Sequence, residues 1–199
     1  ARFSELGFPS TRHEDWRFTN VKPLTELPFQ LDVDNVANGL NGGLFTGLDG
    51  PQLVFVNGRF SKDLSVVGNL PAGVVAGSVA ETLANDDSTI QDFLSRQVRN
   101  GNDAFMALNT AFFADGVLVQ VPESVTVEAP VRVYYLNTTK VDGATANIRN
   151  LIVAGANSAG TVIESWTGGG AAYFNNAITE LVVGDNAQIE HVKFQDEGA

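Results

Sequence analysis

Residues Asn150–Trp166 read NLIVAGANSAGTVIESW, and Glu180–Phe194 read ELVVGDNAQIEHVKF. An earlier stretch, Gly116–Val127, follows the same design with GVLVQVPESVTV. Each is a β-branched run, a short turn of small or Asn/Asp residues and an alternating run, which is typical of strand–turn–strand. No helical signal interrupts residues 117–194, so the pattern predicts a repetitive all-β body, either a meander or a parallel coil of stacked units.

The spacing of the repeats favours the parallel coil. The turn that begins at Gly155 aligns with the turn that begins at Gly184, about one long coil later. We therefore expect Val153 and Val182 to lie side by side on neighbouring parallel strands, not in antiparallel hairpins. The last unit carries no cap, so we expect the chain to stop inside a larger body and its exposed end to favour self-association.

The first part of the chain has a different composition. Thr11-x-x-Glu14 and Ser88-x-x-Gln91 are capping-box patterns that predict helix starts, the first helix carrying Trp16 and Phe18. A further helix is expected from Asp103 to Gly116.

Other signals in this part predict strands and loops. The Asn57-Gly58 pair between Leu53–Val56 and Arg59-Phe60 predicts a β-hairpin. Val74–Ser78 predicts a short strand, and the Gly/Asn-rich residues 33–50 predict loop. The predicted fold is mainly β with an α+β N-terminal domain, residues 1–115, followed by the β body, residues 116–199.

Composition excludes several function classes. The 12 Lys+Arg against 23 Asp+Glu give a net charge of −11, which argues against a nucleic-acid role because phosphate binding needs a basic face. The chain has no Cys, so it offers no thiolate nucleophile or cluster ligand. No signal core or membrane-length apolar run is present, so we expect a soluble protein without a membrane partner.

Three residues of the β body have chemistry of interest. His191 shares one strand face with Ile189 and Lys193 and is a metal-ligand or general-base candidate, although a structural or solvent-facing role is the simpler reading. Glu164 and Glu180 belong to different units and would form a carboxylate pair if stacking brought them together; a solvated face is the simpler expectation. Five aromatic side chains are expected in the core: Trp16, Phe18, Phe112, Phe113 and Phe174.

Several blocks together resemble the SufD family. Gly7–Asn20, GFPSTRHEDWRFTN, is similar to its N-terminal signature, in which a Gly-Phe-Pro turn precedes a Glu-Asp-Trp helix. The remaining blocks follow in the family's order and are Leu53–Ser61, Ala104–Phe112, Asp115–Val117, Arg149–Val153, Phe174–Ala177 with Thr179-Glu180, and Glu190–Gln195.

The resemblance implies the N-terminal half of a component of the Suf iron–sulfur cluster assembly machinery. It implies the beginning of a right-handed parallel β-helix and a non-catalytic scaffold that pairs with SufB and the ATPase SufC, with a homodimer as a further expectation. It places the protein in the cytoplasm, or in the plastid stroma of a eukaryote. The family's proposed interface ligands lie beyond the matched blocks, so no catalytic, cofactor-binding or metal-binding residue and no cofactor is assigned to this segment.

Two enzyme classes remain as alternatives. A carbohydrate-active β-helix enzyme would use several Asp or Glu on one coil face, whereas Asp142, Asp185 and Asp196 fall at turns or ends. A hexapeptide acyltransferase would repeat the single match at Val183–Gln188 many times in tandem, and the sequence does not.

Overall fold

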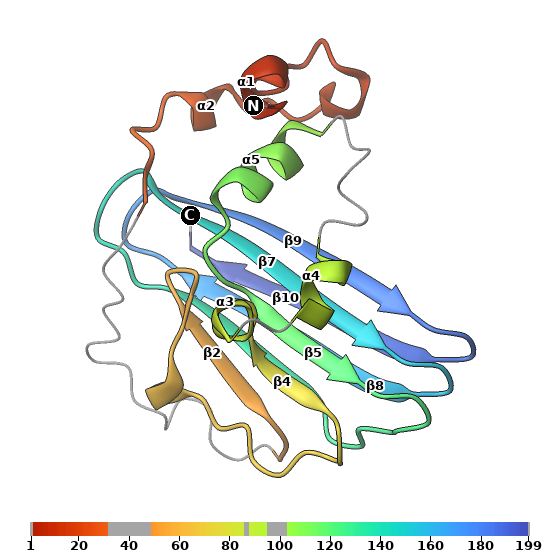
Figure 1. Ribbon diagram of the computed structural model, residues 1–199. Helices are drawn as coiled ribbons and strands as arrows, with labels where there is room; N and C mark the ends of the chain where they lie inside the picture. Colours follow the sequence, from red (N-terminus) through yellow and green to blue (C-terminus); the bar gives the residue numbers. More distant parts are fainter. Residues whose placement is uncertain (1, 32–48, 86–87, 95–102, 199) are drawn as a thin grey trace.

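We describe the fold from a computed structural model, which describes residues 2–31, 49–85, 88–94 and 103–198. The chain is strand-rich and forms two mixed sheets (Figure 1). One sheet, here called the helix-covered sheet, contains β1, β4, β5, β7 and β9. The other, here called the open sheet, contains β2, β3, β6, β8 and β10.

The β body alternates between the two sheets along the sequence. Odd-numbered strands β5, β7 and β9 pair in parallel in the helix-covered sheet, and even-numbered β6, β8 and β10 pair in parallel in the open sheet. Each passage from one sheet to the other and back therefore adds one strand to both. The six strands are β5 (Val117–Val121), β6 (Val131–Asn137), β7 (Ala144–Ala154), β8 (Ala159–Gly168), β9 (Tyr173–Val183) and β10 (Gln188–Glu197).

The predicted parallel stacking is confirmed by the strand register. Val153 pairs with Val182 in neighbouring parallel strands, and β7 and β8 lie in different sheets instead of forming a hairpin. The turns stack as well: Asn157 and Asn186 both have φ 57°, and the Asn186 side-chain amide donates to Asn157 Oδ1 at 2.9 Å. Asn tolerates this left-handed conformation better than most non-glycine residues. The same turn geometry therefore explains both the Asn at this position and the alignment of the two repeats.

Side-chain alternation on β7 builds two cores. Ile148 and Ile152 point between the sheets and pack with Phe55 of β2 and other inner residues. Leu151 and Val153 point outward and pack against the helices. A strand that is buried on both faces reads as a continuous apolar run, as Leu151–Ala154 does.

Antiparallel strands lie at the opposite edge of each sheet from β9 and β10. β2 (Gln52–Val56) and β3 (Arg59–Phe60) form the predicted hairpin, with Asn57 and Gly58 both at positive φ. β4 (Val75–Ser78) pairs antiparallel with β5. The expected boundary at residue 115 thus falls just before β5, although β2 and β4 from the first part pair with strands of the β body.

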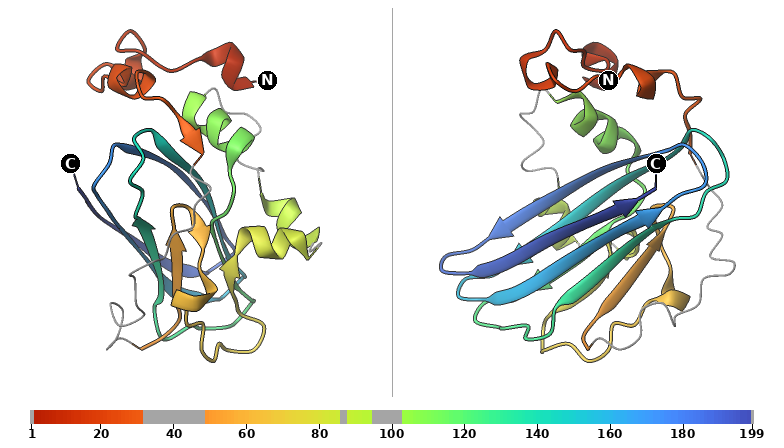
Figure 2. Two further views of the ribbon diagram at one scale, coloured as in Figure 1. Left: turned by 90° about the vertical axis from the view of Figure 1, so that its left-hand side faces the viewer. Right: turned by 180° about the vertical axis from the view of Figure 1, so that it is seen from behind.

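Three helices lie against the helix-covered sheet (Figure 2, left). They are α3 (Val79–Ala84), α4 (Ser88–Phe93) and α5 (Ala104–Phe112). The helix at Asp103 is confirmed: the Asp103 side chain caps it by accepting from Met106 N, but the helix ends at Phe112, before Gly116. Most of the expected 33–50 loop lies outside the described residues. No helix in the described ranges is long and apolar enough to cross a membrane.

The prediction of a helix beginning at Thr11 is wrong. His13 has extended backbone (φ −81°, ψ 134°), and only a 3-10 turn, η1 (Glu14–Trp16), follows it. The N-terminal segment instead holds α1 (Arg2–Leu6), α2 (Lys22–Thr25) and β1 (Gln30–Leu31). The extended residue breaks the helical hydrogen-bond ladder after Thr11, so the capping pattern has no helix to cap.

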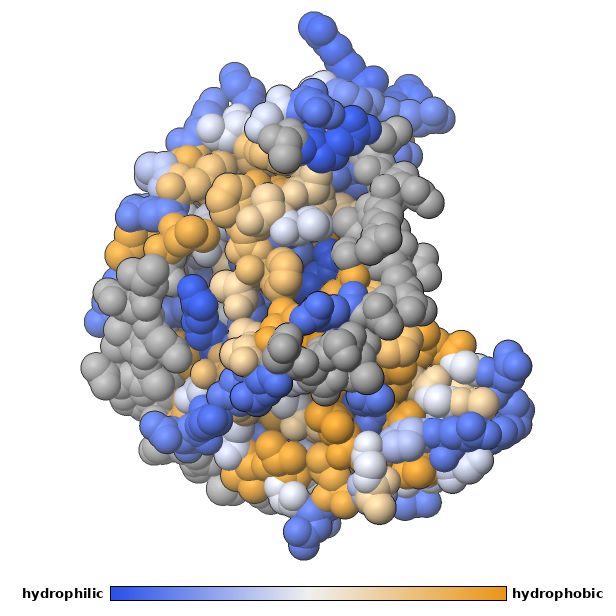
Figure 3. All heavy atoms as spheres, viewed as in Figure 1, coloured by the Kyte–Doolittle hydropathy of each residue, from blue (hydrophilic) through white to orange (hydrophobic). Residues whose placement is uncertain are grey.

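Aromatic contacts attach the N-terminal segment to α5. Phe105 lies 5.0 Å from Trp16, 5.7 Å from Phe8 and 5.9 Å from Phe174, measured between ring centroids. Figure 3 shows apolar side chains gathered below the N-terminal segment, where α5 lies. The prediction that five aromatic side chains lie in the core is wrong for Phe18 and Phe112, which are 92% and 51% exposed. The other three, Trp16, Phe113 and Phe174, are partly buried.

Candidate functional site between the two sheets

The space between the sheets changes from apolar to polar toward β10. The inner face of β6 carries Val131 and Val133, whereas the strands that follow carry Glu164 on β8 and His191 on β10. Strand alternation brings Lys193 and Gln195 to the same inner face as His191. The predicted shared face of Ile189, His191 and Lys193 is therefore found, and it faces the interior.

Glu164 is the centre of a buried network. Its side chain is 1% exposed, and Oε2 accepts from Trp166 Nε1 at 2.9 Å. Oε1 accepts from Asn150 Nδ2 at 3.1 Å and lies 2.9 Å from His191 Nε2. Thr179 contributes a further contact at 3.4 Å. A buried carboxylate is tolerable only when its oxygens are so satisfied, so these neighbours explain why a charge-bearing residue occupies this position.

Asn150, on β7, is bonded to residues of four other strands, β5, β6, β8 and β9, through the same network. It is fully buried, and its Oδ1 accepts from Tyr135 Oη at 2.6 Å and from Val117 N at 3.0 Å. Burial raises the pKa of Tyr135 well above its usual value, and the charge of Glu164 raises it further. The phenol therefore keeps its proton and acts as a donor between β6 and β7.

A stack of aromatic rings runs beside the network. Tyr135 lies 5.0 Å from Phe55 and 4.0 Å from Trp166, and both pairs are stacked. Lys193 Nζ lies 4.5 Å from the centre of the Trp166 ring and so ends the stack with a cation–π contact. Each ring comes from a different strand of the open sheet, so the stack reinforces the strand register.

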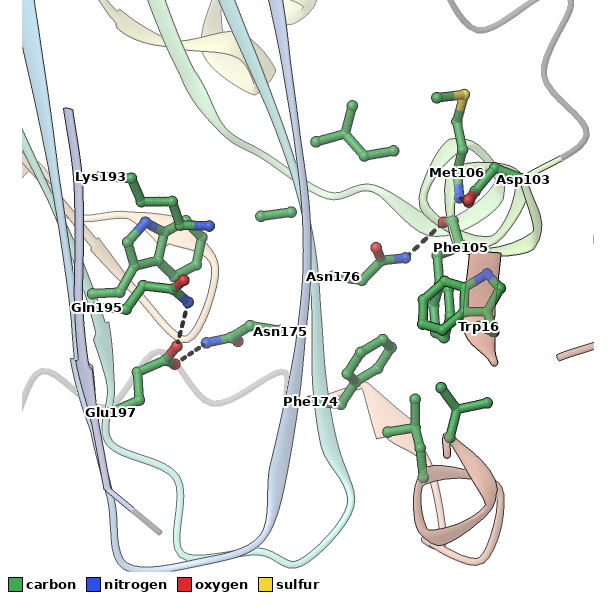
Figure 4. Close-up of a pocket in the computed structure, with 15 residues that line it drawn as sticks. Trp16, Asp103, Phe105, Met106, Phe174, Asn175, Asn176, Lys193, Gln195 and Glu197 are labelled. Carbon is green, nitrogen blue, oxygen red and sulfur yellow. Dashed lines mark hydrogen bonds between the residues drawn. The ribbon is translucent and has the colours of Figure 1, made fainter. Parts of the chain in front are cut away.

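A hollow of about 550 Å³ lies at the β9–β10 end of the molecule (Figure 4). Lys193, Gln195 and Glu197 line it from β10, and Asn175 lines it from β9. Glu197 accepts from Asn175 Nδ2 at 2.8 Å, and Gln195 Nε2 donates to it at 3.2 Å. On the other side of β9 the lining is aromatic, with Phe105 beside Trp16 (Figure 4).

Tyr173 adds a third donor to this group. Its hydroxyl donates to Glu197 at 3.1 Å. Partial burial, followed by the charge and hydrogen bond of Glu197, raises the pKa of Tyr173 to about 12.

Glu180 belongs to a separate network on the outer face of the helix-covered sheet. Arg149 donates to Glu180 Oε1 through Nε at 2.8 Å and through NH2 at 2.7 Å, and both side chains are at most 3% exposed. Arg149 also reaches Asn109 of α5 at 3.3 Å, and Asn109 donates to Ile148 O at 2.8 Å. This network holds α5 against β7.

The two glutamates therefore do not form the carboxylate pair considered from the sequence. Glu164 faces His191 between the sheets, whereas Glu180 faces Arg149 beneath α5. His13 lies on the exposed N-terminal segment, where Ser10 N donates to its Nδ1 at 3.0 Å. Among the residues that the structure describes, no group of three or more His, Cys, Asp or Glu could hold a metal ion.

Sequence reasoning missed Asn150 and Tyr135. Asn150 occupies an inward position between Ile148 and Ile152, and a polar residue at that point of an apolar alternation is the signal that could have identified it. Its partners come from β5, β6, β8 and β9, so no local pattern could have named them.

The arrangement forms a rigid frame with exposed strand edges. The buried side chains satisfy one another and stiffen the stack. Within the described residues β9 pairs only with β7, and β10 pairs only with β8. Both sheets thus present a strand edge at the same end of the molecule, beside the hollow, where further strands or another chain can add.

Two family models match this chain. Residues 1–133 match the SufBD protein N-terminal region, and residues 135–199 match the SUF system FeS cluster assembly SufBD core domain. The chain is 28% identical to an iron–sulfur cluster assembly SufBD family protein of Synechocystis sp., over 96% of this chain and 44% of that protein.

It is also similar to the iron–sulfur cluster assembly protein SufD of Escherichia coli, with 26% identity over 94% of this chain and 42% of the relative. A chloroplastic SufBD family protein of Arabidopsis thaliana is 28% identical over 63% of this chain and 22% of its own length. The chain spans less than half the length of these curated relatives.

Proposed function

The chain belongs to the SufBD family of iron–sulfur cluster assembly proteins, and we propose that it is a non-catalytic scaffold subunit that pairs with SufB and the ATPase SufC. The observation that carries this proposal is the parallel register of β7 with β9 and β8 with β10, which leaves both sheets open at one end. A rigid frame with two aligned strand edges holds partner surfaces in a fixed relation while an ATPase moves.

The strands represent the first coils of a right-handed parallel β-helix. Alternation of successive strands between two parallel sheets supports this reading, and so do the stacked Asn157 and Asn186 turns. Further strands that pair with β9 and β10 would enclose the hollow between Asn175 and Lys193.

This segment has no catalytic role and holds no cluster by itself. Clusters are usually held by thiolates and commonly need about four protein ligands. The imidazole of His191 could coordinate iron, but its Nε2 already lies 2.9 Å from Glu164 Oε1. At most it would supply one ligand to a site completed by another subunit.

The proposed location is the cytoplasm, or the plastid stroma in a eukaryote. The chloroplastic name of one relative supports the second possibility. The carbohydrate-active alternative has no support from geometry, since Glu164 and Glu180 belong to separate networks.

Co-purification tests the proposed partners. The full-length protein, tagged and co-expressed with SufB and SufC from the same source, is expected to elute with both and to give one complex by native mass spectrometry. The matched control is an equally tagged unrelated β-solenoid protein. Recovery of the tagged protein without SufB and SufC, under conditions in which SufB and SufC recover one another, would overturn the proposal.

A further inference from the structure

The hollow at the β9–β10 end of the molecule lies on both sides of the edge of β9 (Figure 4). Asn175 points between the sheets and donates to Glu197 of β10 at 2.8 Å. Asn176 points to the opposite face and donates to Phe105 O of α5 at 2.8 Å. A compact ligand would occupy one of these sides. An extended strand fills both, because its successive side chains point to opposite faces of a sheet.

The outer side of the hollow is apolar. Trp16 of η1, Leu24 of α2 and Met106 of α5 line it, and all three side chains are half-buried. These three residues are here called the outer wall. Phe174 and Ile178 line the hollow from β9. Because neighbouring strands lie only about 4.8 Å apart, the outward side chains of a strand paired with β9 would lie against the outer wall. Apolar side chains suit these positions.

The inner side of the hollow is polar. Lys193 Nζ lies 4.5 Å from the centre of the Trp166 ring, and none of the ion pairs formed by the described residues includes Lys193. Gln195 and Glu197 line the hollow beside it. An acidic or amide side chain at an inward position of an added strand would accept from Lys193. The hollow thus fits a strand with alternating apolar and polar side chains.

The path of the chain indicates which strand this is. The passages from β6 to β7 and from β8 to β9 both cross from the open sheet to the helix-covered sheet, and β9 pairs in parallel with β7. β10 ends at Glu197, which accepts from Tyr173 at the start of β9. A chain that leaves β10 along the same path therefore reaches the edge of β9 at its first residue. The relatives provide the length for such a strand, since this chain spans 44% and 42% of two of them.

We propose that the outer wall clamps the strand that follows β10 in the full-length protein, with this strand paired in parallel to residues 173–178 of β9. The inference rests on the proposed function, because it takes the occupant from a full-length SufBD family protein. The N-terminal segment and the later part of the protein then stabilise one another through the clamped strand.

Amide hydrogen exchange, resolved by residue, tests the clamp. In the full-length protein the amides of residues 173–178 that face the edge should exchange about tenfold or more slowly than in the 199-residue chain. Leu24→Ser should remove most of this protection, whereas Leu24→Met keeps an apolar wall and should retain it. Phe18→Ser is the matched control on the same segment, because Phe18 is 92% exposed and does not line the hollow.

Met106→Ser tests the wall from a second element and should act as Leu24→Ser does. In the 199-residue chain both variants should change exchange of the edge-facing amides by less than about twofold, because unpaired amides exchange fast in any case. This comparison separates a clamp from a general contribution to folding. Unchanged protection in both full-length variants would overturn the proposal. Equal protection in the full-length protein and the 199-residue chain would also contradict it, and a rise with concentration would identify a second copy as the occupant.

Co-purification with SufB and SufC distinguishes this inference from the proposed function. A full-length protein that recovers both partners while its β9 edge is unprotected would remove the clamp and keep the proposed function. A protected β9 edge in a protein that recovers neither partner would do the reverse.

Discussion

Replacing Glu164 by Ala tests whether the buried network holds the two sheets together. The substitution removes the acceptor of Trp166 Nε1, and it leaves the Nδ2 group of Asn150 with only its 3.3 Å contact with Thr179. Trp166 is 1% exposed and Asn150 fully buried, so water does not replace the lost oxygens. One unpaired buried donor lowers the free energy of unfolding by about 1–3 kcal/mol. The weakened Asn150 contact and the small cavity add to this, so we expect a total loss of about 2–4 kcal/mol.

Urea unfolding followed by tryptophan fluorescence measures this loss, since Trp166 belongs to the network. The midpoint should fall while the slope stays constant, which identifies a change in stability. Glu164→Gln keeps the size and one acceptor oxygen but turns its amide toward a donor, so it should cost about 1–3 kcal/mol. Glu128→Gln changes an exposed carboxylate of the same body and should stay within about 0.5 kcal/mol of wild type. A Glu164→Ala loss no larger than this control would refute the reasoning.

Three further substitutions test the Tyr173–Glu197 bond, the stacked turns and the Asn109 network. Difference titration of wild type against Tyr173→Phe should show this phenol titrating with a pKa of about 12. Because folding raises its pKa above the usual tyrosine value of 10.0, the folded state binds the proton more tightly, and the contribution to stability is present below pH 10 and lost as pH rises from 10 to 12. A titration of Tyr173 near 10 would contradict the Glu197 contact. Gly155→Ala should lower the free energy of unfolding by about 1–3 kcal/mol or more, because a Cβ there would lie 2.5 Å from Glu123 N. The control Gly77→Ala places a Cβ with nothing within 4 Å and should lower it by at most about 1 kcal/mol. Equal urea midpoints for the two variants would argue against the stacked turns. Asn109→Ala removes the side-chain hydrogen bonds from Asn109 to Ile148 O and Asn176 O, so amide hydrogen exchange in α5 should become about tenfold faster or more. Thr110→Ala changes an exposed residue of the same helix and is the control. Unchanged exchange in Asn109→Ala would show that this network does not hold the helix.

Local patterns predicted the stacking of the β body correctly. The alignment of Gly155 with Gly184 gave the register of Val153 and Val182, because a turn that needs special backbone geometry repeats at the same point of each unit. The alternation of strands between two sheets did not follow from this pattern, since both faces of β7 are buried and its run is apolar throughout.

The polar network was beyond local reasoning for a different reason. Glu164 meets Asn150 and His191 only after three strands from two sheets have been brought together, and a single sequence carries no signal for such contacts. The prediction of a helix that begins at Thr11 failed because His13 has extended backbone, so the capping pattern is followed only by a short 3-10 turn. Phe18 lies beyond this turn and is exposed. Family blocks identified the chain, but they did not indicate which of their aromatic residues are buried.

Anaerobic reconstitution with iron and sulfide tests the central claim most directly. The full-length protein in complex with SufB and SufC should retain a cluster by absorption spectroscopy and metal analysis. The 199-residue chain alone should retain none, since it has no Cys and its His191 is held by Glu164. Stoichiometric cluster retained by the chain alone, and lost in His191→Ala, would contradict the scaffold account.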